Sequence, residues 1–331
     1  MDKNVNIRVV HDDILNYRCD VLALKYAQYN YGVDRIVTKI LADAGYDTSE
    51  MHPLPDYYKF LKSVPRIGAK SLLFVGVVPL YQFNYREIRV FARRCLGALM
   101  AEAPRTKTLS LTLHGPGYGL DEGEAFESEL AGLLDAISAK NYPPALQTIS
   151  IVERDGRACE RLQSILSDLF PSRKSLEDFH TYLKTEPEKT ERLRAAGYAS
   201  DSKPHVFVAM PFREEMDDVY HYGIQGAIKK AGFLCERADI SAFTGDVMQW
   251  VSDRIRSASL VVADLTDANP NVYLEVGYAW GCGRPTVLLA RDIDQLKFDV
   301  QGQRCIPYKK IKDLETSLAN ELKSLRENGH I

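Results

Sequence analysis

The chain has 331 residues, enough for about two domains that each bury a hydrophobic core. Its composition, 45% hydrophobic and 26% charged, is that of a globular protein, and its net charge of -3 offers no basic stripe for a phosphate backbone. No apolar run approaches the roughly 18 residues that a membrane-spanning helix needs. We therefore expect no direct nucleic-acid partner and no membrane insertion.

The cysteines are scattered along the chain, with no CxxC pair and no histidine at metal-ligand spacing. We therefore expect neither a disulfide framework nor a metal site. The first residues, MDKNVNIRVVHDD, lack the apolar core of a secretory signal. These features favour a cytoplasmic protein.

Strand and helix patterns alternate through the first part of the chain. β-prone or apolar runs predict strands, and apolar residues at helical spacing predict helices. The expected strands are residues 5–10, 19–24, 71–78, 109–113 and 147–152. The expected helices are residues 35–45, 85–102, 122–138 and 158–170, with a loop or short helix at 46–60. This alternation predicts one α/β domain over residues 1–170.

A glycine-rich stretch, HGPGYG, follows the strand expected at residues 109–113. Its glycines, Gly115, Gly117 and Gly119, would let backbone N–H groups approach a phosphate and form an anion-binding nest. The alternative is that these glycines only make a tight turn between strand and helix. A short glycine cluster is compatible with both interpretations.

The order of these pieces resembles the macro domain superfold. The resemblance lies in the early strand followed by DDILNYRCDVLAL, in GVDRIVTKILADAG and in GPGYGLDEGEAFESELAGLLDAI. Macro domains hold ADP-ribose and related nucleotides with an early Asn-rich loop, which here reads KYAQYNYG, and a later Gly-rich loop. The resemblance implies that the first domain binds a nucleotide-like ligand at Gly115, Gly117 and Gly119.

Residues 171–203 change in character, because Lys, Glu, Asp and Arg dominate them and a Gly/Ser patch lies at 197–202. Opposite charges at i, i+4 spacing favour a solvated helix, and the Gly/Ser patch favours a flexible joint. We therefore expect a charged helical linker over 171–203 and a second domain over 204–331.

The second domain again alternates strands and helices. The expected strands are residues 205–210, 233–236, 261–264, 286–290 and a short strand near 306. The expected helices are residues 219–232, 247–257, one that carries Glu275, and 311–326. This predicts a flavodoxin-like or TIR-like parallel sheet with flanking helices. On the Glu275 helix we expect Gly277 and Gly281 to permit close packing on the sheet, and Tyr278 and Trp280 to lie in the core.

Polar side chains gather where the strands of this sheet end, the edge at which parallel α/β sheets bind ligands. The candidate residues are Met210, Pro211, Phe212 and Arg213 after the first strand, Arg237 and Asp239 after the second, residues 264–271 with Asp264, Asn269 and Asn271 after the third, and Glu275 on the following helix. No Walker lysine, GxSxG elbow or Cys/His pair is present, so phosphoryl transfer by a P-loop and acyl transfer by a triad lack support.

Carboxylates beside amides suit the cleavage of a bond between a sugar C1′ and a base nitrogen. Such cleavage needs a carboxylate that traps or stabilises an oxocarbenium-like transition state, and Glu275 is the candidate. We expect nearby asparagines and backbone N–H groups to keep it ionised. Asp264 would either contact substrate or cap its loop, and the two asparagines would either bind substrate or form turns. Arg213 would either meet a phosphate or remain a solvated loop residue.

The layout VFVAMPF, ERAD, FTGD, VVADLTDANPNVYLEVGYAWGCGRPTVLL and FDV resembles the nucleoside 2-deoxyribosyltransferase-like and TIR-like proteins. In both families a Glu on the helix after the third strand is catalytic, and Glu275 matches it. The resemblance implies that Met210, Pro211 and Phe212 enclose the base. It also makes Asp264 and Asp239 the acids of the loops.

Together these features predict a two-domain enzyme that cleaves an N-glycosidic bond of NAD or another nucleotide, as an effector in bacterial antiviral defence. We expect nucleotide-like ligands at both domains, no cofactor, and self-association. One alternative is a non-catalytic nucleotide-binding signalling module. Another is a housekeeping deoxynucleoside monophosphate glycosidase or deoxyribosyltransferase.

Overall fold

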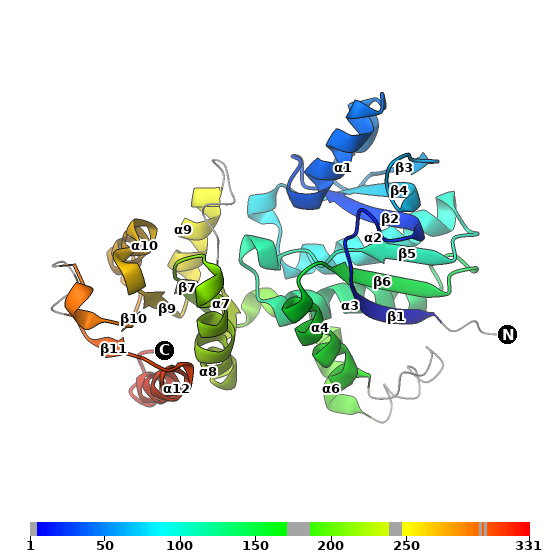
Figure 1. The fold of residues 1–331 in the computed structure, drawn as a ribbon. Helices are drawn as coiled ribbons and strands as arrows, with labels where there is room; N and C mark the ends of the chain where they lie inside the picture. Colours follow the sequence, from blue (N-terminus) through cyan, green and yellow to red (C-terminus); the bar gives the residue numbers. More distant parts are fainter. Residues whose placement is uncertain (1–4, 171–185, 238–246, 298–299, 301–302) are drawn as a thin grey trace. The chain divides into compact units, whose positions relative to one another are not determined.

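The computed structural model describes residues 5–170, 186–237, 247–297, 300 and 303–331 (Figure 1). The chain divides into two compact units: unit 1 is Met1–Gly115 with Glu122–Asp201, and unit 2 is Pro116–Asp121 with Ser202–Ile331. Each unit is an α/β structure built on its own sheet, which confirms the predicted fold class. Within the described ranges, no helix is long and apolar enough to cross a membrane.

Unit 1 contains a six-stranded sheet in the order β1-β6-β5-β2-β4-β3, in which only the β3–β4 pair is antiparallel. The strands are β1 (Asn6–His11), β2 (Cys19–Tyr26), β3 (Tyr58–Lys62), β4 (Ala69–Gly76), β5 (Thr108–Leu111) and β6 (Thr148–Glu153). The expected loop or short helix at 46–60 is confirmed over residues 46–57, which contain a 3-10 turn at Thr48–Met51, whereas strand β3 corrects the expectation from Tyr58 onwards. It lies at the sheet edge and buries only Leu61, so its sequence lacks the apolar alternation that marks a strand.

Helices cover the sheet of unit 1. They are α1 (Gly32–Asp43), α2 (Tyr85–Glu102), α3 (Glu122–Ser138), α4 (Gly156–Leu169) and α6 (Pro187–Ala195), with short 3-10 turns at Thr48–Met51, Leu80–Gln82 and Ser200–Ser202. Val37 and Leu41 of α1 join a core with Leu22 and Leu24 of β2. Helices α2 and α3 pack on each other, and α3 is buried along most of its length.

The charged segment that follows α4 contains helix α6, which belongs to unit 1. Residues 171–185 lie outside the described residues, but α6 packs against α3. The buried Arg89 of α2 makes a bidentate ion pair with Asp135 of α3, at 2.7 and 2.9 Å. The same guanidinium donates to the carbonyl groups of Leu193, Arg194 and Ala196. An arginine of unit 1 therefore caps the C-terminal end of α6, and the part of the expected linker from α6 to Asp201 belongs to unit 1.

Unit 2 contains a five-stranded sheet in the order β11-β10-β9-β7-β8, with every neighbouring pair parallel. The strands are β7 (His205–Ala209), β8 (Leu234–Glu236), β9 (Leu260–Asp264), β10 (Thr286–Ala290) and β11 (Cys305–Pro307). The chain runs from β7 to one side, where it forms β8, and then crosses to the other side to form β9. This is the flavodoxin-type order, and it has its topological switch point between β7 and β9.

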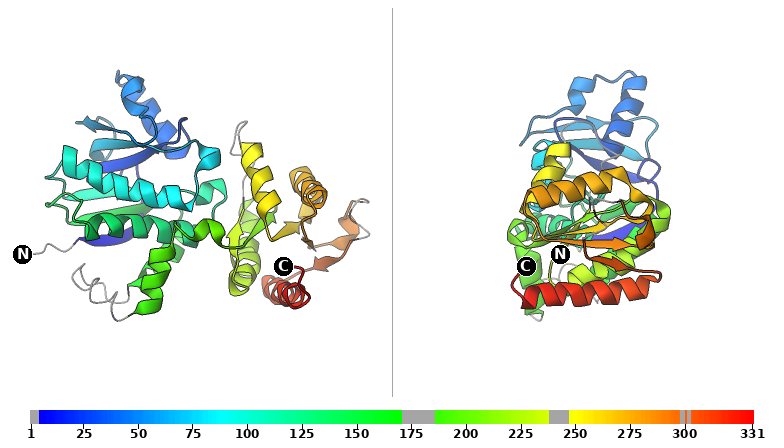
Figure 2. Two further views of the ribbon diagram at one scale, coloured as in Figure 1. Left: turned by 180° about the vertical axis from the view of Figure 1, so that it is seen from behind. Right: turned by 90° about the vertical axis from the view of Figure 1, so that its left-hand side faces the viewer.

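Two helical layers enclose this sheet. The helical segments are α7 (Glu214–Asp218), a π-helical segment (Val219–Gln225), α8 (Gly226–Lys230), α9 (Val247–Ser257), α10 (Pro270–Gly281) and α12 (Ile311–Glu327), with 3-10 turns at Thr266–Ala268 and Ile293–Gln295. Figure 2 shows α10 and α12 on opposite faces of the strands. On the α12 face, Val206, Val262 and Leu289 form a core with Leu314 and Leu318.

The outer face of α10 differs from the expected packing. Gly277 and Gly281 are exposed, with open space where a side chain would extend, and Trp280 is 38% exposed. The prediction that these glycines allow close helix–sheet packing, and that Trp280 is core, is therefore wrong. The helix instead buries the positions spaced by three and four residues on its other side. These are Val272, Glu275, Val276 and Ala279.

Candidate functional site

The candidate site of unit 2 lies at the carboxyl edge of its sheet, at the switch point between β7 and β9. In open α/β sheets ligands bind in the crevice outside this point, because the loops leave it in opposite directions. Here the loops that leave the switch point are residues 210–213 after β7 and residues 265–269 after β9. Helix α10 begins directly after the second loop and packs against β7, β9 and β10.

Glu275 lies on the sheet-facing side of α10, five residues after Pro270. Its side chain is buried at 6% exposure, and it has no hydrogen-bond or ion-pair partner among the described residues. Burial raises the pKa of Glu275 from 4.5 to about 8. Burial therefore favours the protonated form of Glu275 at neutral pH.

The expectation that asparagines and backbone N–H groups keep Glu275 ionised is therefore wrong. Asn269 instead caps the N-terminus of α10, where its Oδ1 accepts a hydrogen bond from the backbone N–H of Asn271 at 2.9 Å. Asn271 itself is exposed at the first turn of the helix. Asn269 therefore stabilises the start of α10 and donates no hydrogen bond to the carboxyl group of Glu275 further along the helix.

Asp264, the last residue of β9, is fully buried, and both of its oxygens are engaged by the protein. Its Oδ2 accepts a hydrogen bond from the Tyr308 hydroxyl at 2.6 Å, and its Oδ1 accepts one from the backbone N–H of Thr266 at 3.0 Å. Burial raises the pKa of Asp264 despite these donors. Its contacts match the loop-capping alternative, and a direct role in catalysis stays a prediction.

The loop after β9 makes a left-handed turn and forms an ion pair with the loop after β7. Asp267 and Ala268 have φ angles of 62° and 49°, which are uncommon for residues other than glycine. The Asp267 carboxylate pairs with the Arg213 guanidinium. This ion pair joins the two loops that flank the switch point.

The loop after β7 contributes the residues expected to enclose a base. Met210 and Pro211 are buried, and Phe212 is partly exposed. The guanidinium of Arg237, directly after β8, lies between the rings of Phe212 and Tyr220, at 4.2 and 4.0 Å from their centroids. Its Nη1 also lies 3.6 Å from the Met210 sulfur. An arginine sandwiched between aromatic rings thus adjoins the candidate base-binding residues.

One residue that matters for this site, Tyr308, was not among the candidates. Arg237 and Asp267 belong to the strand-end residues selected from the sequence, but no role was assigned to either of them. Tyr308 comes from the far end of the sheet, and no local pattern connects it to Asp264. Asp239 lies in residues 238–246, outside the described residues.

The glycine-rich loop HGPGYG, expected to bind a ligand in the first domain, makes most of its contacts with unit 2. Gly115 and Gly119 adopt φ angles of 107° and 100°, which favour glycine, and a 3-10 turn (Pro116–Tyr118) lies between them. Residues 116–121 pack in unit 2. The Gly119 carbonyl accepts a hydrogen bond from the backbone N–H of Arg237 at 3.0 Å, whereas Gly117 is exposed with open space around it. Ligand binding by these glycines stays a prediction.

The polar side chains of the early loop KYAQYNYG have partners within unit 1. The Gln28 side chain donates to two backbone carbonyls at 2.9 and 3.4 Å, and Asn30 Nδ2 lies 3.1 Å from His52 Nε2. Lys25 and Asp34 form a buried ion pair at 3.0 Å. These groups hold the loop in place.

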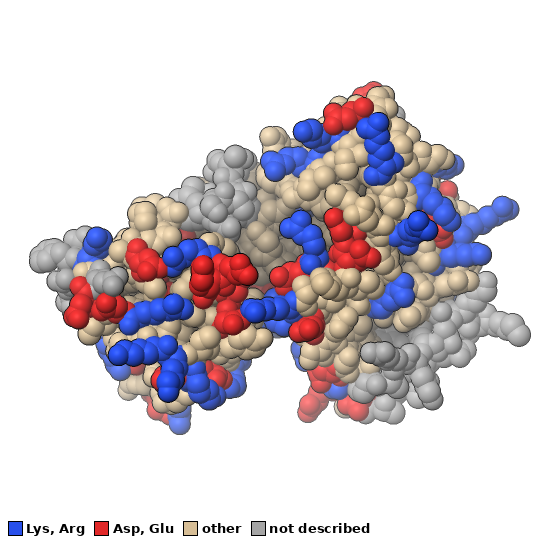
Figure 3. Space-filling model, viewed as in Figure 1, with Lys and Arg blue, Asp and Glu red and all other residues tan. Residues whose placement is uncertain are grey.

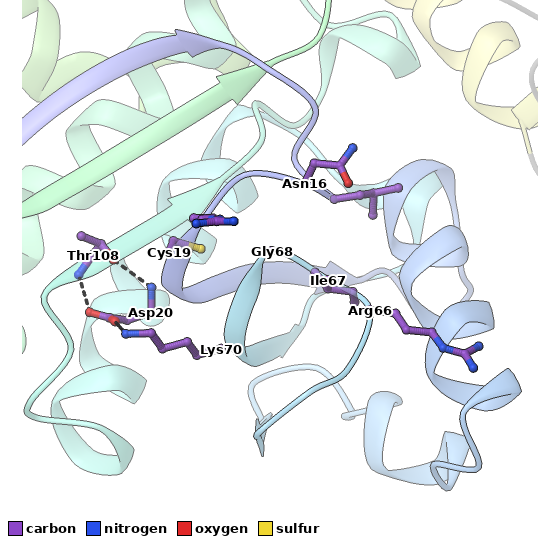
Figure 4. Close-up of a pocket in the computed structure, with 10 residues that line it drawn as sticks. Asn16, Cys19, Asp20, Arg66, Ile67, Gly68, Lys70 and Thr108 are labelled. Carbon is purple, nitrogen blue, oxygen red and sulfur yellow. Dashed lines mark hydrogen bonds and ion pairs between the residues drawn. The ribbon is translucent and has the colours of Figure 1, made fainter.

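A cavity of about 500 Å³ opens at the opposite, amino edge of the unit 1 sheet (Figure 4). Cys19 and Thr108, at the amino ends of β2 and β5, line it. Lys70 reaches Asp20 at 2.7 Å, while Arg66 points away from them. Burial raises the pKa of Cys19 to about 11, so its thiol is not activated as a nucleophile. We assign no reaction to this cavity.

The described residues contain no group of His, Cys, Asp or Glu side chains arranged to hold a metal ion. All six cysteines of the chain are free thiols. Figure 3 shows Lys and Arg side chains interspersed with Asp and Glu on the visible face, without a continuous basic stripe among the described residues there. This distribution does not resemble the electrostatic footprint of a nucleic-acid interface.

No protein-family model matches this chain. No curated protein matches it. Among solved structures, it is similar to a Trypanosoma brucei macrodomain in complex with ADP, at 10% sequence identity and a TM-score of 0.37, over 49% of this chain and 69% of that one. It is also similar to a mutant Oceanobacillus iheyensis macrodomain with ADPR, at 15% identity and a TM-score of 0.38, over 52% of this chain and 96% of that one. The resemblance to deoxyribosyltransferase-like and TIR-like proteins stays a prediction, and these structural neighbours are macrodomains that cover about half of the chain.

Proposed function

We propose that unit 2 cleaves the N-glycosidic bond of a nucleotide-like substrate, with Glu275 at the reaction centre. The observation that supports this proposal is a buried carboxyl group, without a partner among the described residues, on the helix beside the switch point. Burying a carboxyl group in this way costs free energy, and such groups cluster at functional sites. Asp264 would act indirectly, by holding the loop that precedes this helix.

In the proposed reaction, ionised Glu275 approaches C1′ of the ribose while the bond from C1′ to the base nitrogen breaks. The bonding electron pair leaves with the base, and the carboxylate traps or stabilises the oxocarbenium-like sugar. Water then attacks C1′ and loses a proton, and where the carboxylate has trapped the sugar, the bond from Glu275 to C1′ breaks and its electron pair returns to the carboxylate. A nicotinamide ring carries its own positive charge, which favours the ionised carboxylate and lets the base leave without being protonated. NAD therefore suits this site better than a neutral nucleoside does.

The raised pKa of Glu275 supports a second role for the same residue. A carboxylic acid that keeps its proton at neutral pH can donate it to a leaving group, as a general acid. In that case Glu275 would protonate a neutral base as it departs, and water would attack C1′ directly. The two roles require opposite protonation states of one side chain.

The test is to incubate the purified full-length protein with NAD, nucleoside 5′-monophosphates and nucleosides, and to follow free base by chromatography. We expect base release by the wild type and none by Glu275→Gln, which keeps the shape of the side chain. Glu327→Gln, at an exposed position near the end of α12, is the matched control and should retain activity. Ligand binding without any base release would instead favour the non-catalytic signalling module.

We also propose that a nucleotide-like ligand binds at Gly117, in the glycine-rich segment that packs in unit 2. Gly117 is exposed and has space for a side chain, so Gly117→Trp should leave the fold intact. Loss of ADP-ribose binding in this variant, measured by isothermal titration calorimetry with circular dichroism as the folding control, would support the proposal. Unchanged binding would contradict it.

We further propose that the two modules form an antiviral effector, in which self-association controls the destruction of a nucleotide pool. A ligand-binding module on the same chain as a degradative enzyme supports this setting. The proposal requires that base release per chain rises with protein concentration, together with the oligomer fraction measured by light scattering. A rate per chain that stays constant across monomer and oligomer would count against it.

A further inference from the structure

Arginines follow three of the five strands of unit 2 at the edge where the candidate site lies. Arg213 lies four residues after the end of β7, Arg237 directly follows β8, and Arg291 directly follows β10. The first turn of α7 beside them carries Glu214 and Glu215. Since these acids would repel an anion, the arginines are the groups that would have to attract one.

The three arginines differ in how they are held. Arg237 lies between two aromatic rings, and its Nη2 is 3.7 Å from Asp217. Arg291 is exposed at the end of β10, and its backbone N–H donates to Thr266. Arg213 is the one that reaches across the switch point, because its partner Asp267 belongs to the loop on the other side.

The Arg213–Asp267 pair has the properties of a contact that another anion can replace. Its side chains are 47% and 52% exposed, and ion pairs in such positions contribute little to stability. Asp267 makes the contact from a left-handed backbone conformation that is unfavourable for a side chain with a Cβ. The Arg213 guanidinium is therefore held between the two loops by a weak ion pair. Its partner, Asp267, carries a negative charge, as a phosphate group does.

We propose that Arg213 binds a phosphate group of the substrate, and that Asp267 occupies the position of this phosphate while the site is empty. A phosphate dianion carries more charge than a carboxylate and accepts a bidentate hydrogen bond from a guanidinium, so it replaces Asp267. The site then takes nucleotides in preference to nucleosides. This inference rests on the proposed function, because it names the substrate class of the same site.

The test compares kcat/KM for a nucleoside 5′-monophosphate and for the matching nucleoside. Arg213→Ala should lower the value for the nucleotide by about 10- to 100-fold, the usual effect of losing a hydrogen bond to a charged group, and leave the nucleoside value unchanged. Arg213→Lys should restore only part of the loss, because an ammonium group lacks the bidentate fork. Asp267→Asn should lower KM for the nucleotide, since it removes the competing anion.

Arg304→Ala is the matched control, because the exposed Arg304 forms an ion pair with Glu321 of α12, and it should change neither value. Equal losses for nucleotide and nucleoside in Arg213→Ala, or no loss for either, would overturn the inference. Nucleotide binding measured by calorimetry separates this inference from the proposed function, and Glu275→Gln allows the measurement without base release. If the wild type releases no base but binds the nucleotide, and Arg213→Ala loses this binding, the phosphate site is supported and the glycosidase is refuted.

Discussion

Glu275 should destabilise the folded protein at alkaline pH, and replacing it with Gln should remove this cost. Burial raises its pKa from 4.5 to about 8, so the folded state retains a proton that the unfolded state has already released. The stability associated with this proton is fully present below pH 4.5 and is lost as the pH rises towards 8. The rise of the pKa from 4.5 to about 8 corresponds to a loss of about 5 kcal/mol in the free energy of unfolding, at about 1.4 kcal/mol per pKa unit. This is a large part of the stability of a domain.

The assay is thermal unfolding of wild type and Glu275→Gln from pH 5 to 9, followed by differential scanning calorimetry. Near pH 5 the two Tm values of unit 2 should be similar, and by pH 9 the Tm of the variant should be higher by about 15 to 20 °C. Glu327→Gln, exposed near the end of α12, should not show this divergence. A Tm difference between wild type and Glu275→Gln that stays constant with pH would refute the reasoning, because Glu275 would then be accommodated in its ionised form.

Two further predictions concern the supporting structure. Tyr308→Phe should lower the free energy of unfolding, measured in urea, by about 1 to 3 kcal/mol, because it leaves a buried oxygen of Asp264 without its donor. An unchanged midpoint of unfolding would show that this hydrogen bond contributes nothing to stability. Gly132→Ala should destabilise unit 1, because the added Cβ would lie 2.1 Å from the Arg89 carbonyl oxygen, whereas Gly117→Ala should be tolerated. Equal thermal stability of the two alanine variants would contradict the close approach of α2 and α3.

Most elements of the fold could be predicted because their hydrophobic periodicity is strong. Helices α2, α3 and α9 begin and end where the pattern of apolar residues places them. Strand β3 could not be recognised, since an edge strand with exposed side chains has no apolar alternation. The packing of residues 116–121 in unit 2 depends on contacts between residues more than a hundred positions apart. A local pattern carries no information about such contacts.

The placement of the candidate residues in the fold could be predicted, but their electrostatics could not. Parallel strands bring their carboxyl ends to one edge, so the position of Asp264 at that edge follows from the alternation of elements. The protonation state of Glu275 does not, because it depends on which donors reach its carboxyl group. The amide of Asn269 caps the helix, and the donor from Tyr308 goes to Asp264. Burial is therefore what sets the direction of the pKa shift of Glu275.

The pH dependence of kcat/KM for base release tests the central claim most directly, because this ratio reports the ionisation of the free enzyme. If Glu275 acts as a carboxylate at C1′, kcat/KM rises with pH and reaches a plateau with a midpoint near its pKa of about 8. An exposed carboxylate away from the site should not matter, so Glu327→Gln on α12 should give the same profile as the wild type. A kcat/KM that falls through this range would assign Glu275 the role of general acid, and one that is flat, with Glu275→Gln still active, would contradict a role in the chemistry.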